Sequence, residues 1–310
     1  MKKSIIFILS ITFWFAMMLC NINKGYGQGI KTNDTIPSRK DTATSATKTC
    51  AECHGVLLDK KIKHPSKTDK GCAECHNNGD KEHPKTAITL VSGITELCFS
   101  CHDKQKKLIA SSPFVHKVVN DKKACVNCHN PHSSDEKGLL TAKRKDLCLS
   151  CHNKAIVVSP AKTLPDMDKL YKTSKTLHPP FKTCSKTCHN PHASKDYRLL
   201  DLAFPVNNYL SVNVDSVGLC WECHEMDLVQ AEKTTITNFR NGDRNLHYVH
   251  IHGEKGRSCT VCHSPHATNN PHLIRDKVGF GSWEFKMNYS ANDAGGSCAP
   301  ACHQERKYTR

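Results

Sequence analysis

The stretch FVHKVVNDKKACVNCHNPH, residues 114–132, carries a Cys-x-x-Cys-His motif with histidines before and after it. A second stretch, YVHIHGEKGRSCTVCHSPH at residues 248–266, aligns with it without a gap. Two thiols three residues apart, followed directly by a histidine, are the pattern of covalent haem attachment. The thiols form thioethers with the haem vinyl groups, and the adjacent histidine becomes the proximal iron ligand. Both stretches are therefore predicted haem sites.

The attachment motif occurs nine times along the chain. Seven copies are regular, and two, Cys184–His189 and Cys298–His303, contain one extra residue between the cysteines. The predicted attachment cysteines are Cys50, Cys53, Cys72, Cys75, Cys98, Cys101, Cys125, Cys128, Cys148, Cys151, Cys184, Cys188, Cys220, Cys223, Cys259, Cys262, Cys298 and Cys302. The predicted proximal ligands are His54, His76, His102, His129, His152, His189, His224, His263 and His303. We therefore expect nine covalently bound haem c groups.

Other cysteine chemistries fit the spacing less well. Structural zinc sites group cysteines into sets of four ligands and do not require a histidine after every second cysteine. A thioredoxin-like redox motif would occur once, beside a βαβ pattern. A disulfide scaffold would not fix the histidine. For the two longer motifs, a disulfide loop without haem remains the alternative.

The motifs are organised in a repeated unit. Each unit contains a leading histidine, a first motif, a trailing histidine, a leucine-containing stretch and a second motif. The units span residues 64–102, 116–152, 178–224 and 250–303, and the Cys50 site stands in front of them. The leading histidines are His64, His116, His178 and His250, and the trailing histidines are His83, His132, His192 and His266. These eight side chains are predicted distal iron ligands.

A ninth distal ligand is needed if every iron has two histidines. The candidates are His247, His252 and His272, and we favour His247 because it would share a helix face with His250. A trailing histidine three residues after a proximal one cannot easily reach the opposite face of the same haem. We therefore expect His132 and its counterparts to ligate neighbouring haems, which would hold those haems close together.

Composition predicts a fold built around the cofactor. Hydrophobic residues make up 38% of the chain and aromatic residues 6%, below the apolar share of ordinary globular domains. Each segment has too few apolar positions to bury itself. We expect a mainly irregular multihaem cytochrome c architecture with short α-helices, little or no β-sheet and a closely packed haem chain. Without haem, we expect a largely disordered chain, as in domains that fold only with their metal.

The N-terminus is predicted to direct export. Lys2 and Lys3 precede an apolar run, and small residues follow at 25–27, so residues 1–27 are a predicted signal peptide. An uncleaved anchor and a lipid-modified Cys20 are the alternatives. Beyond a linker at 28–49, we expect a five-haem segment at 50–153, a connecting segment at 154–177 and a four-haem segment at 178–310. The mature protein is expected in the periplasm, with the cell surface or exterior as alternatives, and peripheral to any membrane.

The sequence resembles multihaem cytochromes c with doubled CXXCH motifs. The resemblance rests on CVNCHNPHSSDEKGLL…LCLSCH (125–152), CSKTCHNPHASKDYRLL…LCWECH (184–224) and CTVCHSPHATNNPHLI…CAPACH (259–303). It implies electron transfer with redox partner proteins of the cell envelope. Some relatives are periplasmic decahaem subunits of outer-membrane barrel conduits, and others polymerise into filaments. Nine sites instead of ten make the conduit match inexact.

Electron transfer is therefore the expected function, because iron with two histidine ligands has no vacant position for substrate. A reductase of nitrite, hydroxylamine or sulfur oxyanions would need one five-coordinate haem, and a filament subunit could take a distal histidine from the next chain. The formal net charge of +15 is expected to offset haem propionates. Nucleic acid binding is not expected, because no basic–aromatic pattern accompanies the charge.

Overall fold

The structure is a computed structural model that describes residues 49–65, 71–77, 87–160, 162–184, 187–205, 207–210 and 217–310. The chain divides into two units, Met1–Thr47 and Lys48–Arg310, and all described residues belong to the second. The predicted signal peptide, Cys20 and His83 lie outside the described residues. Within the described ranges, no helix is long and apolar enough to cross a bilayer.

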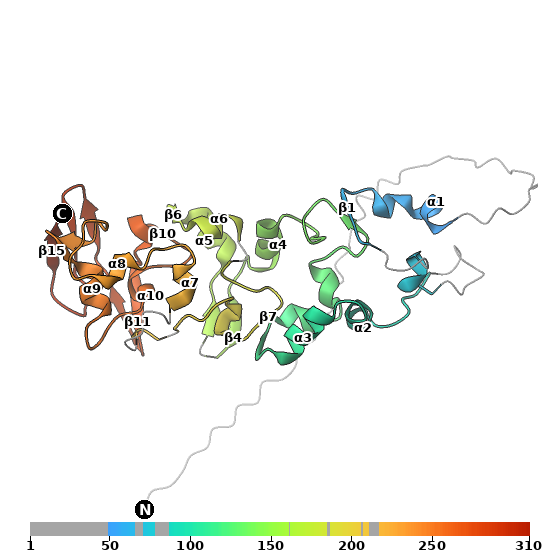
Figure 1. Cartoon of the computed structure of the whole chain (residues 1–310), viewed down its shortest axis with the longest axis horizontal. Helices are drawn as coiled ribbons and strands as arrows, with labels where there is room; N and C mark the ends of the chain where they lie inside the picture. Colours follow the sequence, from blue (N-terminus) through green and yellow to red (C-terminus); the bar gives the residue numbers. More distant parts are fainter. Residues whose placement is uncertain are drawn as a thin grey trace, which may run out of the picture. The chain divides into compact units, whose positions relative to one another are not determined.

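The helices are short, and α3 with nine residues is the longest of those described. The α-helices are α1 (Cys50–His54), α2 (Ile94–Phe99), α3 (Asp103–Ser111), α4 (Arg144–Cys151), α5 (Met167–Thr173), α6 (Pro179–Thr183), α7 (Gly218–Trp221), α8 (Asp227–Gln230), α9 (Leu246–Ile251) and α10 (Cys259–Cys262) (Figure 1). The 3₁₀ helices are η1 (Gly55–Leu58), η2 (Gly71–Glu74), η3 (Lys117–Asn120), η4 (Ala124–Asn127), η5 (Tyr197–Leu199) and η7 (Pro271–Leu273). Helices of this length are not stable alone and depend on their surroundings.

Strands are also present, although the sequence predicted little or no β-sheet. The strands are β1 (Ile62–Lys63), β2 (Phe114–Val115), β3 (Ser133–Ser134), β4 (Ile156–Ser159), β5 (Lys162–Leu164), β6 (Thr176–Leu177), β7 (Ala193–Ser194), β8 (Arg240–Asn241), β9 (Arg244–Asn245), β10 (Ala267–Thr268), β11 (Lys277–Phe280), β12 (Trp283–Lys286), β13 (Ser290–Asn292), β14 (Gly295–Cys298) and β15 (Arg306–Thr309). In the described part of the chain they form seven small antiparallel sheets, of which β13–β14–β15 alone has three strands.

Three of these sheets repeat the same connection between successive units. The pairs are β1 with β3, β2 with β7 and β6 with β10. In each pair, the residues just before a leading histidine bond to the residues just after the trailing histidine of the next unit. The backbone N–H of His116, for example, donates to the carbonyl of His192 at 3.0 Å. The short strands therefore join each unit to the following one.

Two hydrophobic clusters lie in the C-terminal part of the described chain. Leu210, Val217, Val229 and Ile251 form one, and partly buried Cys220 and Cys259 pack against it. Val261, Val278 and Met287 form the other, and Cys262 packs against it. Among the described residues, the first buried side chain is Val119. The apolar side chains thus gather around attachment cysteines instead of forming one central core.

The predicted connecting segment at 154–177 carries regular structure. It contains the β4–β5 hairpin, helix α5 and strand β6, which pairs with β10. Asp166 caps α5, because its carboxylate accepts the backbone N–H of Lys169 at 2.8 Å. The segment belongs to the same compact part of the structure, Lys48–Arg310, as the motifs on either side of it.

Candidate functional site

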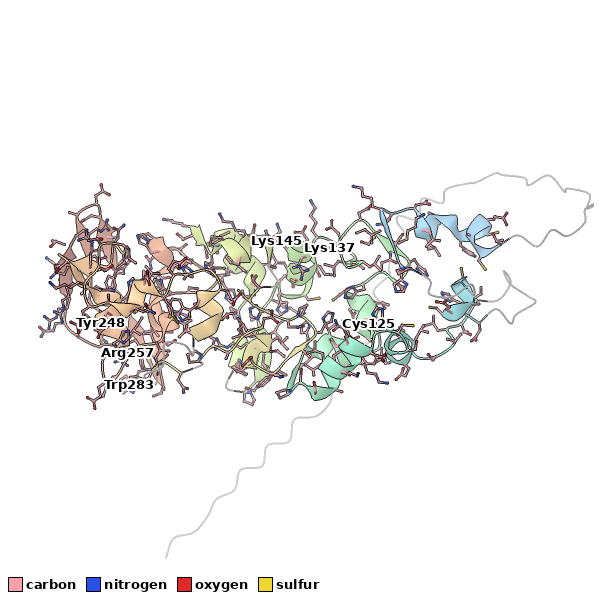
Figure 2. All side chains as sticks on the ribbon, viewed as in Figure 1. Cys125, Lys137, Lys145, Tyr248, Arg257 and Trp283 are labelled. Carbon is pink, nitrogen blue, oxygen red and sulfur yellow. The ribbon has the colours of Figure 1, made fainter. Side chains whose placement is uncertain are left out.

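Most attachment motifs fold as one turn of helix. In the six regular motifs of the repeat units, the backbone N–H of the proximal histidine donates to the carbonyl of the first cysteine at 2.9–3.0 Å. This turn places both thiols and the imidazole of a motif beside one another. In the longer motif at Cys298, His303 N–H donates instead to Pro300 at 3.1 Å, and in the other Cys184 adopts a left-handed conformation with φ +49°. The eighteen described attachment cysteines form no disulfide with one another, and Cys125 of the opening stretch is labelled in Figure 2.

The histidine side chains face one another in twos. Eight pairs have ring centres 6.0–6.4 Å apart, and each joins one predicted proximal ligand to one predicted distal ligand. With the proximal residue first, the pairs are His102–His64, His76–His132, His152–His116, His129–His192, His224–His178, His189–His266, His263–His247 and His303–His250. No proximal–proximal or distal–distal pair occurs at this spacing among the described histidines.

The spacing of these rings fits two ligands on either side of one metal ion. A bond between a metal and an imidazole nitrogen is about 2 Å long, and the ring centre lies roughly 1 Å further away, so the two ring centres would be roughly 6 Å apart. The rings are nearly parallel in five pairs, at 7–11°. The interplanar angle is 22° for His247–His263, 46° for His250–His303 and 62° for His64–His102. The residues therefore fit the axial ligation of haem iron, with adjacent cysteines for attachment.

The pairs follow one rule along the chain. Each leading histidine faces the second proximal histidine of its own unit, as His116 faces His152. Each described trailing histidine faces the first proximal histidine of the preceding unit, as His192 faces His129. Neither type of distal residue faces the proximal histidine nearest to it in sequence. The second, third and fourth units therefore each contribute one imidazole to a site of the unit before.

The structure distinguishes between the three candidates for the ninth distal ligand. His247 faces His263 with ring centres 6.4 Å apart. His252 stacks on Tyr248 at 4.3 Å and its Nε2 lies 2.8 Å from the carbonyl of Val229. His272 has φ +54°, and its backbone carbonyl lies 2.8 Å from Nδ1 of His263. His247 thus occupies the position that a trailing histidine of a fifth unit would fill.

Backbone carbonyls orient three proximal histidines in the same way. Nδ1 of His129, His189 and His263 lies 2.7, 2.9 and 2.8 Å from the carbonyl of the residue nine positions later. These acceptors are Gly138, Arg198 and His272, and each begins a pair of consecutive residues with positive φ. A proton on Nδ1 leaves Nε2 free to bind metal. The only sequence signal for this contact is that the leucine-containing stretch follows these three motifs at the same spacing.

An asparagine two residues earlier fixes the backbone of several distal histidines. The side-chain oxygens of Asn130, Asn190 and Asn245 accept the backbone N–H of the histidine two positions later at 2.9, 3.1 and 3.0 Å. The Asn-x-His pattern was a usable sequence signal for His247. It is not sufficient alone, because Asn270 precedes His272 at the same spacing.

Burial favours the neutral, ligating form of these imidazoles. Burial, together with a facing histidine, lowers the pKa of His266 and of His247 to about 4. Burial also lowers the pKa of His189, His192 and His263. A neutral imidazole is the form that binds a metal ion.

Attachment cysteines of successive repeat units lie close enough to affect one another's pKa. The Cys98 thiol interacts with that of Cys125 in the next unit, and burial together with this neighbour raises the pKa of Cys98 to about 12. The neighbouring Cys184 raises the pKa of Cys148, and Cys259 raises that of Cys220. Each contact joins the second motif of one unit to the first motif of the next. Neighbouring attachment sites are therefore close enough to influence one another electrostatically across all three boundaries between repeat units.

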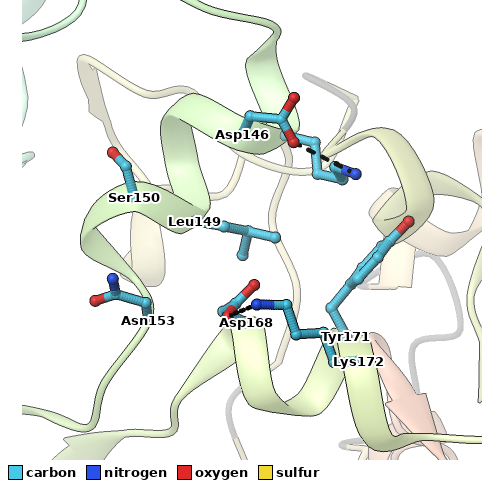
Figure 3. A pocket seen from close by; sticks show the side chains of 8 residues that line it. Asp146, Leu149, Ser150, Asn153, Asp168, Tyr171 and Lys172 are labelled. Atoms are coloured by element: carbon cyan, nitrogen blue, oxygen red, sulfur yellow. Dashed lines mark hydrogen bonds and ion pairs between the residues drawn. The ribbon is translucent and has the colours of Figure 1, made fainter.

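A cavity of about 380 Å³ opens between α4 and α5 (Figure 3). Leu149 and Ser150, the two residues inside the Cys148 motif, line one side. On the α5 side, the Lys172 ammonium donates to Asp168 at 2.6 Å. Lys145 of α4 reaches across to the ring of Tyr171, with its nitrogen 5.0 Å from the ring centre. Its charged groups are thus engaged with other protein side chains.

The comparisons with known proteins agree with the motif pattern. A model of the family described as "Doubled CXXCH motif" matches residues 64–107, 116–156, 178–228 and 252–280, together more than half of the chain. The "Cytochrome c-type protein NrfB" of Haemophilus influenzae is 27% identical over 142 residues, which cover 40% of this chain and 59% of that protein. The "Multiheme cytochrome MtrA" of Shewanella baltica is 31% identical over 121 residues, which cover 36% and 34%. The matched region is thus less than two thirds of either relative.

Proposed function

This chain belongs to the doubled CXXCH family of multihaem c-type cytochromes, and on that premise we propose that it transfers electrons along nine haem c groups, each with two histidine ligands. Covalently bound haem supplies the one-electron chemistry. The chain attaches each haem through two cysteines, orients two imidazoles toward its iron and sets the spacing between neighbours.

The observation that carries this proposal is the facing of proximal and distal histidines. Eight histidine pairs have ring centres 6.0–6.4 Å apart, and each consists of one predicted proximal ligand and one predicted distal ligand. Iron with two imidazoles has no open position for a substrate, so the arrangement favours electron exchange over catalysis. We therefore propose a carrier, not a reductase.

The pairing rule also assigns the first site. A trailing histidine faces the first proximal histidine before its own unit, as in His132–His76, His192–His129 and His266–His189. Applied to the first unit, the rule assigns His83 to His54 of the Cys50 site. His83 lies outside the described residues, so this assignment rests on the repeat. It completes nine sites with ligands from one chain.

The proximity of attachment cysteines supports a continuous path. Cys98–Cys125, Cys148–Cys184 and Cys220–Cys259 join successive units. Within units, Cys75 lies near Cys101, and Cys188 lies near Cys223. Since the thiols bond to the edge of the macrocycle, neighbouring thiols favour short distances between haem edges. We propose that electrons pass between sites in their sequence order.

We propose that the protein is exported and exchanges electrons with redox partner proteins of the cell envelope. The predicted signal peptide and the need for covalent haem attachment support export. An outer-membrane barrel partner remains a proposal from resemblance. Distal histidines supplied within the chain favour a discrete carrier over a filament that borrows ligands from its neighbour.

Intact-mass spectrometry of the mature protein tests the haem number. The expected mass is that of the chain from residue 28 plus nine haems. A mass with seven haems would instead assign the two longer motifs, at Cys184 and Cys298, to disulfide loops.

A further inference from the structure

The distal ligand His247 belongs to no repeat unit, so different residues hold it. Trailing histidines His132 and His192 are followed by strands that pair with the preceding unit. His247 instead lies in the first turn of α9, three residues before His250. Tyr248 of the same helix is labelled in Figure 2. This helix thus carries two distal ligands, one for the His263 site and one for the His303 site.

Asn245 anchors the start of this helix. Its side chain is fully buried, accepts the backbone N–H groups of His247 and Tyr248, and donates to the carbonyls of Leu228 and Ala231 at 3.0 and 2.9 Å. These bonds fix the backbone of His247. They do not fix the rotation of its imidazole, which requires a partner for the ring itself.

Thr237 supplies that partner. Its hydroxyl oxygen lies 3.2 Å from Nδ1 of His247, and the residue is only 6% exposed. The same oxygen accepts the backbone N–H of Phe239 at 3.1 Å, and the Phe239 ring packs edge-on against His247 at 5.1 Å. If His247 binds iron through Nε2, Nδ1 carries the proton and donates it to the Thr237 hydroxyl. The loop that precedes α9 therefore orients the ring through one side chain.

This contact differs from those of comparable distal histidines. Nδ1 of His178 lies 3.0 Å from the carbonyl of Pro265, and Nδ1 of His250 lies 2.7 Å from that of Leu246. A hydroxyl shared between two donors is a weaker acceptor than a backbone carbonyl. A weaker acceptor leaves less electron density on the imidazole, which makes the ligand less basic and the ferric state less stable.

We propose that Thr237 is a positioning residue that fixes the tautomer and rotation of His247 and sets the reduction potential of the haem attached at Cys259 and Cys262. This inference rests on the proposed function, because it takes His247 as the distal ligand of that haem. It concerns one haem site of the nine. It predicts that substitution of Thr237 shifts the midpoint potential of that haem, which the loss of a purely structural threonine would not do.

The test uses variants of the full-length holoprotein, with redox titration followed by electron paramagnetic resonance. Thr237→Val removes the acceptor while keeping the side-chain volume, and one haem should shift to a more positive midpoint with an altered low-spin signal. Thr237→Ser should restore the wild-type midpoint. Thr237→Asn offers a stronger carbonyl acceptor and should shift the same haem to a more negative midpoint.

Thr234 provides a matched control in the same loop. Its hydroxyl accepts the backbone N–H of Ile236 at 3.1 Å, the same turn that Thr237 makes with Phe239. Thr234→Val should leave every midpoint unchanged. Equal shifts in Thr234→Val and Thr237→Val would overturn the inference. If Thr237→Val fails to mature, an unchanged midpoint in Thr237→Asn would overturn it instead.

A separate variant distinguishes this inference from the proposed function. His247→Ala should convert one haem from low spin to high spin. If it does so while the Thr237 variants change nothing, the role of Thr237 is wrong and the ligation stands. If His247→Ala leaves all haems low-spin, the proposed ligation of this site is wrong, and the inference fails with it.

Discussion

The ring centres of His192 and His129 lie 6.0 Å apart, although the two residues belong to different repeat units and are 63 positions apart in the sequence. The backbone of the same residue accepts the N–H of His116 at 3.0 Å. One residue of the third unit therefore serves two sites of the second, one through its ring and one through its carbonyl. Units joined in this way are expected to mature and unfold together.

Removal of His192 should affect the site of the preceding unit. In His192→Ala, the haem attached at Cys125 and Cys128 loses its distal ligand, so the reduced protein should bind about one carbon monoxide per chain. Wild-type protein should bind none. His252→Ala is the matched control, because this exposed ring stacks on Tyr248 and faces no proximal histidine. Carbon monoxide binding by the control, or none by His192→Ala, would contradict the pairing rule.

The same assay addresses the first site. His83→Ala should expose one iron to carbon monoxide, because the repeat assigns His83 to His54. His272→Ala should not, since the contact of His272 with His263 is made by its backbone carbonyl, which alanine retains. If His272→Ala binds carbon monoxide and His83→Ala does not, the assignment of both residues is wrong.

Ring orientation predicts distinct classes of low-spin signal. Nearly parallel imidazoles give rhombic spectra, and strongly crossed imidazoles give highly anisotropic ones. The five pairs at 7–11° should form the first class, and His64–His102 at 62° and His250–His303 at 46° the second. Low-temperature electron paramagnetic resonance of the oxidised protein measures both. A spectrum with the rhombic class alone would be at odds with these angles.

The turn that orients His129 should be sensitive to a β-carbon. Gly138 has φ +77°, so Gly138→Ala should lower the free energy of unfolding by about 1 kcal/mol through backbone strain. Gly55 has φ −54° and an equally open surround, so Gly55→Ala should not destabilise the protein. Denaturant titration compares the two. Equal destabilisation would argue against strain as the cause.

Folding should depend on haem attachment. Among the described residues, buried side chains are few and pack around attachment cysteines such as Cys259 and Cys262. Chain produced without haem attachment should therefore show the far-ultraviolet circular dichroism of a largely disordered polypeptide. A native-like spectrum without haem would mean that the polypeptide alone supplies the stability.

The candidate ligands could be selected from the sequence because the selection depends on local spacing alone. An attachment motif is defined by two cysteines three or four positions apart and a histidine directly after the second. This definition does not depend on how the repeat units are arranged in space. The pairing was not predictable, because it depends on which units meet. His132 was expected to reach a neighbouring haem, but only the contact of β1 with β3 places it opposite His76.

Features set by backbone geometry were also beyond the sequence. Two-residue strands such as β2 and β7 have no periodicity to detect, since a strand pattern needs about four residues. The positive φ of Arg198 and His272 occurs at residues that do not signal a turn. Thr237 gave no sequence signal, because its partner His247 is itself outside the repeat.

Near-infrared magnetic circular dichroism of the oxidised full-length protein tests the central claim most directly, because its charge-transfer bands identify the axial ligands of ferric haem. The account predicts bands of bis-histidine low-spin haem alone, with an intensity that corresponds to nine haems per chain. A high-spin band, or a band of any other axial ligand pair, at the intensity of one haem or more would contradict it.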